Sequence, residues 1–177
     1  MKINDKPLLA LQAPISSRSG YGDKSRDILK SIIELDKYDI KIIPTAWGST
    51  PQNQINPETE FGKFILENII TKLDKKPDVF VQVTVANEAN PIGKFNILCT
   101  SVVETTMAPR EFIEGSNRMD LVITPSEFTK DVLSQTGYNQ VDKQTQKTVG
   151  VIKLTTPVVV LFEGVNTDIF QEIEWID

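Results

Sequence analysis

Short apolar runs alternate along the whole chain with segments whose apolar residues recur at helical spacing. A short apolar run bounded by polar or turn residues is typical of a buried strand, and an apolar stripe along one side is typical of an amphipathic helix. Strands that alternate with such helices predict a parallel sheet covered on both faces. The expected strands cover residues 7–13, 39–45, 78–85, 96–100, 121–124 and 157–162.

Capping residues predict where the helices between these strands begin and end. The first helix is expected from Asp23 onwards. The second is expected to begin at Asn56, since Asn is a favoured N-cap and a proline follows it, and to end at residues 75–77. Ser126 is the expected N-cap of the last helix, which Gly137 ends.

Residues 138–150 interrupt this alternation because they hold few apolar side chains and no helical stripe. We expect a protruding β-hairpin or a mobile loop there, with residues 151–154 as a return strand. The predicted fold is therefore α/β, a three-layer αβα sandwich. It has a mainly parallel sheet of about six strands, plus a protruding hairpin or loop near 138–154.

The composition excludes several classes of chemistry. The chain of 177 residues has no histidine, which removes Ser-His-Asp and Cys-His catalysis and histidine metal sites. Its single cysteine excludes an internal disulfide and multi-cysteine zinc sites. A net charge of −5 gives no general basic surface for duplex DNA. No apolar run reaches the roughly 18 residues of a membrane helix, and no signal pattern opens the chain, so we expect a cytoplasmic protein without a membrane partner.

Ligands of open parallel sheets bind beyond the carboxyl ends of the strands, so the residues after each strand are the candidates for a site. Ser19, Gly20, Tyr21 and Gly22 follow the first strand and precede the first helix. Glycines allow a close backbone approach, and the first amides of a helix suit a phosphate. The segment matches neither GxGxxG nor GxxxxGK[ST], so it indicates either an anion or sugar site or a simple capped turn.

Polar residues also follow the third strand. Thr84, Asn87, Glu88 and Asn90 together supply donors and acceptors that suit sugar hydroxyls. The competing interpretation is a polar turn that ends at Pro91.

A third candidate group surrounds the fourth and fifth strands. Glu104 and Thr105 follow the fourth strand, and a carboxylate in partly apolar surroundings can act as a base. Glu104 is alternatively a helix cap or a surface residue. Arg118, before the fifth strand, is either a partner for a phosphate or carboxylate, or a surface cation. Cys99 lies inside an apolar run and is expected to be a buried structural thiol.

Three segments carry the sequence motifs that are most specific for a protein family: SGYGDKSR, NRMDLVITPSEFTK and LFEGVNTDIF. Together with DIKIIPTAWGSTPQ, VFVQVTVANEANPIGKFNI and ETT, they resemble the N-terminal half of GT-B glycosyltransferases. The likeness is greatest to a group common in large tailed phages and their bacterial relatives. It covers almost the whole chain and implies a Rossmann-like domain. Asn166 stands where the family usually has an aspartate.

The resemblance implies a transferase that uses a nucleotide sugar as substrate, without a metal and without a further cofactor. In such enzymes the N-terminal domain chiefly holds the acceptor. The segment Ser19–Gly22 would lie beside the donor diphosphate and sugar, with Asn87, Glu88, Glu104 and Thr105 facing the acceptor. The acceptor is a modified nucleobase of phage DNA, a surface glycan or a protein, and the acidic charge does not favour DNA.

The resemblance also implies a domain division. Residues 1–165 would form the Rossmann-like N-terminal domain, and residues 166–177 would begin the crossover to a donor-binding domain. That domain is not in the 177 residues, so a C-terminal extension or a partner chain would supply it, and the isolated chain is expected to be inactive. Two alternatives stay open: a non-catalytic interaction module that needs a partner protein, and, more weakly, a nucleotide-dependent oxidoreductase.

Overall fold

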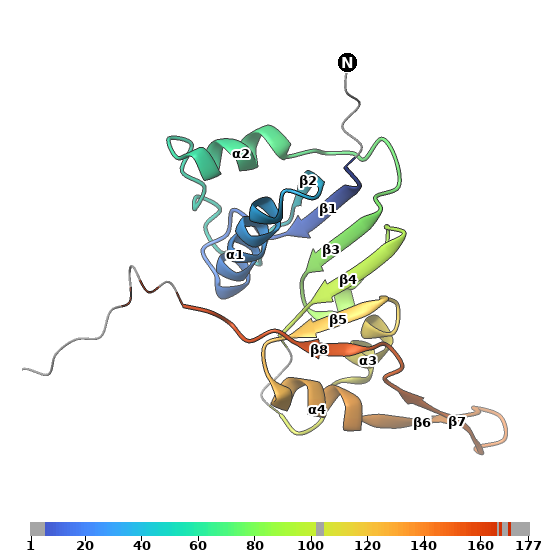
Figure 1. The fold of residues 1–177 in the computed structure, drawn as a ribbon. Helices are drawn as coiled ribbons and strands as arrows, with labels where there is room; N and C mark the ends of the chain where they lie inside the picture. The colour runs from blue at the N-terminus through green and yellow to red at the C-terminus, as the bar shows by residue number, and fades with distance from the viewer. Residues whose placement is uncertain (1–5, 102–104, 166, 168–169, 171–177) are drawn as a thin grey trace, which may run out of the picture.

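The computed structural model describes residues 6–101, 105–165, 167 and 170. Six strands form one sheet in which every neighbouring pair is parallel, in the order β2-β1-β3-β4-β5-β8 (Figure 1). The prediction of an α/β fold with a six-stranded parallel sheet is confirmed. The strands are β1 (Leu8–Ala13), β2 (Asp39–Pro44), β3 (Val79–Val83), β4 (Phe95–Cys99), β5 (Leu121–Thr124) and β8 (Val158–Val160).

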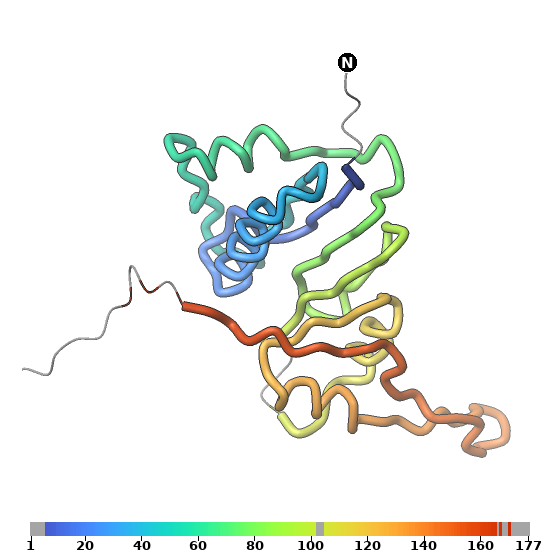
Figure 2. Tube along the Cα trace, in the orientation of Figure 1, coloured from blue at the N-terminus to red at the C-terminus, as the bar shows by residue number. Residues whose placement is uncertain are grey.

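Helices cover both faces of this sheet and enclose two separate cores. One core lies under α1 (Gly20–Leu35) and α2 (Glu60–Asn68), and it includes Leu29 and Ile65. The other lies under the short helix η1 (Ala86–Glu88), α3 (Arg110–Ser116) and α4 (Glu127–Gln135). Figure 2 follows the same chain path as a tube, with the first two helices beside β1 and β2 and the last two below β5.

Successive side chains of a strand point to opposite faces of the sheet, which explains why the central strands are apolar throughout. On β3, Phe80 belongs to the core under α3 and α4, while Val81 belongs to the core under α1 and α2. On β4, Leu98 belongs to the core under α3 and α4, and Cys99 belongs to the core under α1 and α2. Both faces of the sheet are therefore buried, as the continuous apolar runs indicate.

Two of the predicted helix starts need correction. The first helix begins at Gly20 rather than Asp23, because the Ser19 hydroxyl caps it by accepting the Gly22 N–H. The second begins at Glu60 with Thr59 as its N-cap, while the Asn56 side chain accepts the Glu58 N–H in the turn before it.

The predicted end of the second helix is also wrong. It ends at Asn68, because Ile69 is extended and forms a parallel bridge with Ile42 of the edge strand β2. Pairing with the open edge of the sheet therefore ends the helix before residues 75–77. For the last helix, Ser126 is confirmed as the N-cap, and the helix ends at Gln135, just before Gly137.

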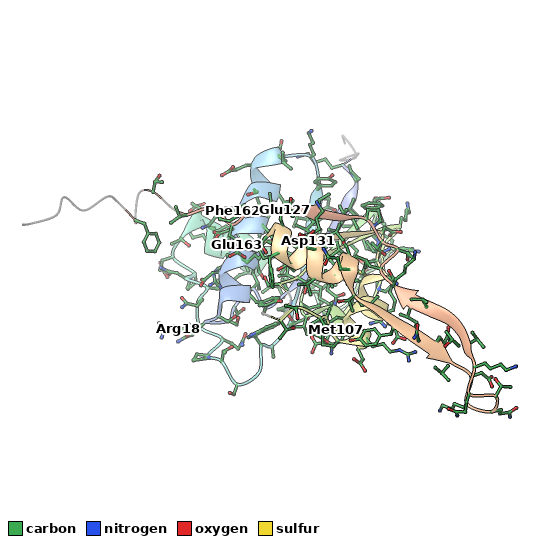
Figure 3. All side chains as sticks on the ribbon, turned by 90° about the horizontal axis from the view of Figure 1, so that it is seen from below. Arg18, Met107, Glu127, Asp131, Phe162 and Glu163 are labelled. Carbon is green, nitrogen blue, oxygen red and sulfur yellow. The ribbon has the colours of Figure 1, made fainter. Side chains whose placement is uncertain are left out.

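The segment that interrupts the alternation forms a separate antiparallel hairpin. Its strands are β6 (Gly137–Val141) and β7 (Thr148–Lys153), and Gly137 pairs with Lys153 at its base. The hairpin extends away from the sheet (Figures 1 and 3). Of the two interpretations of this segment, the hairpin is confirmed.

Within the residues that the structure describes, no helix is both long enough and apolar enough to cross a membrane.

Cys99 is predicted to be chemically silent in the native protein. Its side chain is buried on β4, and burial raises the pKa of the thiol to about 12, although Lys24 opposes the shift. Since the thiolate is the reactive form, an aromatic disulfide reagent at pH 8 should leave the folded protein unlabelled. After denaturation it should label one thiol per chain, because the sequence has one cysteine. Rapid labelling of the folded protein would contradict this packing.

Candidate functional site

The carboxyl ends of the parallel strands lie at one rim of the sheet, and the chain changes direction there between β1 and β3. After β1 the chain enters α1, which packs on one face, whereas after β3 it enters η1, which packs on the other. The two connections diverge and leave a crevice between neighbouring strands. Crevices of this kind are the usual ligand sites of open parallel sheets.

A hollow of about 280 Å³ occupies this crevice. Gln12 of β1 and Gln82 of β3 line it, and these two residues are direct neighbours across the sheet. Thr45 and Trp47, which follow β2, form a second side of the hollow. The third side comes from the segment after β3, where the side chains of Thr84, Glu88 and Asn90 gather.

The side chains of Gln82 and Arg118 hold the segment after β3 in place from two sides. The Gln82 side chain is 6% exposed; it accepts the Asn90 N–H and donates to the Glu88 carbonyl, at 2.9 and 3.2 Å. From the other side, the Arg118 guanidinium donates to the carbonyls of Ala89 and Asn87, at 2.8 and 2.9 Å. The segment is therefore fixed before any ligand arrives, which lowers the entropic cost of binding.

Several polar groups in the hollow are free to bind a ligand. In the part of the chain that the structure describes, the side chains of Gln12, Thr45 and Asn90 form no hydrogen bond to the protein. The Glu88 carboxylate accepts the Thr84 hydroxyl through Oε2, at 2.7 Å, and its Oε1 accepts no hydrogen bond from the residues that the structure describes. The hollow thus offers two amides, a hydroxyl and a carboxylate oxygen, a mixed set of donors and acceptors.

A stacked aromatic pair forms one wall of the site. The rings of Tyr21 and Trp47 lie 4.1 Å apart between centroids, at 20° to each other. The Tyr21 hydroxyl donates to the Ser101 carbonyl and accepts the Ser101 N–H, at 2.9 and 3.0 Å. These bonds attach the start of α1 to the segment just after β4. The Tyr21 ring is therefore held in place, and stacking against it restricts the position of the Trp47 indole.

A second hollow of about 280 Å³ lies on the other side of this pair, since Trp47 lines both. Gly20 and Lys24 of α1 line it, together with Ser101 and Glu163. Among the described residues, the Gly20 and Tyr21 amides have no hydrogen-bond partner, as expected for the first turn of a helix. The Lys24 ammonium lies 2.9 Å from Glu163 Oε1.

The structure brings part of the predicted site together. Gly20 and Tyr21 line the second hollow and Glu88 lines the first, so these residues meet at one rim across Trp47. Ser19 caps α1, and a Cβ on Gly22 would lie 2.3 Å from the Ser17 carbonyl oxygen, so both residues shape the turn.

The other predicted residues lie apart from the two hollows. Asn87 contributes its carbonyl to Arg118, and the Arg118 guanidinium is engaged in holding that segment. The Thr105 hydroxyl donates to the Met107 carbonyl at 2.9 Å. Glu104 lies outside the described residues. No group of three or more Asp, Glu or Cys side chains that could hold a metal occurs in the described ranges.

The sequence prediction missed Trp47, Gln12, Gln82, Lys24 and Glu163. A signal for the two glutamines was present, since each is a polar residue inside an otherwise apolar strand. Trp47 follows the second strand at the same rim, which marks it as a candidate by the same rule that selected Glu88. Nothing in the order of residues indicates that Glu163 reaches Lys24.

The sheet order and the position of the hollows define a Rossmann-like parallel α/β domain with a candidate ligand site at its switch point. No family model, no curated protein and no solved structure matches the chain.

Proposed function

We propose that this chain is the acceptor-side half of a glycosyltransferase, which transfers a sugar from a nucleotide-sugar donor to an acceptor. The observation that carries the proposal is the polar hollow at the switch point, one side of which is the indole of Trp47. Sugars present an apolar face of C–H groups and a rim of hydroxyls. An aromatic platform beside free amide, hydroxyl and carboxylate groups fits both parts.

The second hollow suits the donor side of the same reaction. Negative charge builds on the leaving diphosphate as the bond to the sugar breaks, and it has to be stabilised by fixed donors. The free amides of Gly20 and Tyr21 at the start of α1 provide such donors, and the Lys24 ammonium, which pairs with Glu163, lies beside them. In this assignment Glu88 faces the acceptor, and Glu104 stays the predicted base.

Replacing Trp47 by alanine is expected to weaken sugar binding by at least tenfold, or about 1.4 kcal/mol. The change removes the apolar platform and leaves the hydrogen-bonding groups in place. Saturation-transfer-difference NMR with a panel of free monosaccharides, nucleoside diphosphates and nucleotide sugars would measure it. We expect at least one saccharide and one nucleotide sugar to bind the wild-type chain.

Phe95→Ala is the matched control, because Phe95 is an exposed aromatic residue at the opposite end of β4. It should bind sugars as the wild type does. If no member of the panel binds, or if both variants lose binding equally, the glycosyltransferase proposal is wrong.

A second candidate function, the interaction module that needs a partner, is favoured by the exposed hairpin. Three of its valines are exposed: Val141, Val149 and Val151. This candidate predicts protein association with no ligand in the rim hollows. The sugar-binding experiment therefore separates the two functions.

A further inference from the structure

The outer half of the β6–β7 hairpin exposes apolar side chains that nothing in the described chain covers. Val141, Val149 and Val151 are 45%, 63% and 59% exposed. Val151 pairs with Asn139, two residues before Val141, so Val141 and Val151 share one face of the hairpin, and Val149 lies at the bulge between them. We call these three valines, with the lysines described next, the hairpin surface.

The hairpin surface carries positive charge in an acidic protein. Residues 137–153 hold three lysines (Lys143, Lys147 and Lys153) and one aspartate, a net charge of +2. The whole chain has a net charge of −5, so the remainder carries −7. No ion pair engages the three lysines within the described residues. Asp142 instead accepts the Thr145 N–H and hydroxyl inside the turn, which lowers its pKa.

The base of the hairpin is fixed so that its outer half stands away from its own domain. The Tyr138 hydroxyl donates to the Ala108 carbonyl at 2.6 Å, and the Asn117 side chain donates to the Lys153 carbonyl at 2.8 Å. Ile152 packs against the core under α3 and α4. Figure 3 shows the hairpin projecting to one side of the molecule. A two-stranded hairpin by itself is only marginally stable in water.

A surface of opposite charge lies where α4 begins and β8 ends. Glu127 and Asp131 of α4 lie on it beside Phe128, which is 54% exposed. Leu161 and Phe162, at 55% and 82% exposure, follow β8. The Leu161 N–H donates to the Thr124 carbonyl, which places this segment next to the start of α4. α4 packs against β8, and Figure 3, seen from below, labels Phe162 after β8 and Glu127 and Asp131 on α4. We call these five residues the α4–β8 surface.

We propose that the hairpin surface of one chain docks on the α4–β8 surface of a second copy of this chain. Apolar side chains would meet in the centre, valines against Phe128, Leu161 and Phe162. The hairpin lysines would face Asp131 and Glu127 at the rim, where Glu127 also pairs with Lys130 of its own helix at 3.0 Å. An apolar centre with a polar border is the usual arrangement of an interface. The opposite charges of the two surfaces would speed and orient the encounter. This association does not depend on the proposed glycosyltransferase function.

Sedimentation velocity and light scattering on the purified 177-residue chain test this proposal. At about 50 mM salt we expect a mass of at least twice the 19.8 kDa of one chain, with a dissociation constant that rises at about 500 mM salt. Val141→Asp with Val151→Asp, and separately Lys143→Glu with Lys147→Glu, should each weaken association by at least tenfold. A wild-type chain that stays monomeric at about 100 μM overturns the proposal.

A mixing experiment identifies the two surfaces. The Val141→Asp/Val151→Asp chain keeps the α4–β8 surface, and a Glu127→Lys/Asp131→Lys chain keeps the hairpin surface. Each should be monomeric alone, and the mixture should form a heterodimer, because one docking contact is intact. Lys75→Glu with Lys76→Glu makes the same charge change as Lys143→Glu with Lys147→Glu, but elsewhere on the exposed surface, and should leave association unchanged. Association that these hairpin variants do not alter contradicts the assignment.

Discussion

Replacing Gly22 by alanine is expected to destabilise the fold by about 3 kcal/mol and to deform the rim that carries both hollows. A Cβ there would lie 2.3 Å from the Ser17 carbonyl oxygen and 2.7 Å from the Ser17 hydroxyl. The Ser17 carbonyl cannot move freely because it accepts the Arg26 guanidinium at 3.1 Å. Overpacking of this kind typically costs about 1–3 kcal/mol, and the strained contact here is with backbone. Urea denaturation followed by circular dichroism measures the change.

Gly20 supplies the matched control, since it lies two residues earlier in the same helix turn. Outside its immediate chain neighbours and its own helix backbone, no atom of the described residues lies within 4 Å of the position that a Gly20 Cβ would take. Gly20→Ala should therefore change the free energy of unfolding by less than about 0.5 kcal/mol. Equal destabilisation by the two substitutions would show that the close approach of Gly22 to Ser17 is not what holds this turn.

Phe80→Ala is expected to give the largest loss of stability, about 3–5 kcal/mol. Phe80 is fully buried on the central strand β3. Its ring belongs to the closely packed core under α3 and α4, which includes Leu98 and Ile113, so removing it leaves a cavity there. Since domains of this size are stable by only about 5–15 kcal/mol, much of the stability would be lost. The midpoint of thermal unfolding should fall accordingly.

Phe95→Ala removes the same side chain from the neighbouring strand and serves as the comparison. Phe95 is 44% exposed at the start of β4, and its N–H donates to the Asp78 carbonyl whichever side chain is present. We expect a loss below about 1 kcal/mol. If the two alanine variants unfold at the same midpoint, the core assigned to Phe80 is wrong.

The strands were the most predictable part of the fold. The runs at 78–85 and 96–100 became β3 and β4, because continuous apolar sequence has one stable position in an α/β domain, inside a sheet buried on both faces. Helix ends were less predictable. Asn56 has good capping chemistry, but Thr59 caps α2, and the pairing of Ile69 with Ile42 ends that helix early.

The sequence predicted where the candidate site lies, but it predicted only some of the residues that form it. The rule that ligands bind beyond the carboxyl ends of strands led to Gly20, Tyr21 and Glu88, which line the two hollows. The same rule also applies to Trp47, which follows β2, but its part in the site depends on stacking against Tyr21, 26 positions earlier in the chain. Arg118 was selected for its charge, whereas its bonds to the Asn87 and Ala89 carbonyls give it a structural task.

By itself, the sequence determined the class of fold, the strands and the positions of most turns, because apolar periodicity and capping act over a few residues. Only the tertiary structure decided that β1 lies between β2 and β3, so that Gln12 and Gln82 become neighbours and a hollow forms beside them. It also decided that Lys24 meets Glu163 and that the hairpin stands clear of the domain. These outcomes depend on contacts between residues far apart in the chain. Local sequence patterns do not predict the energies of such contacts.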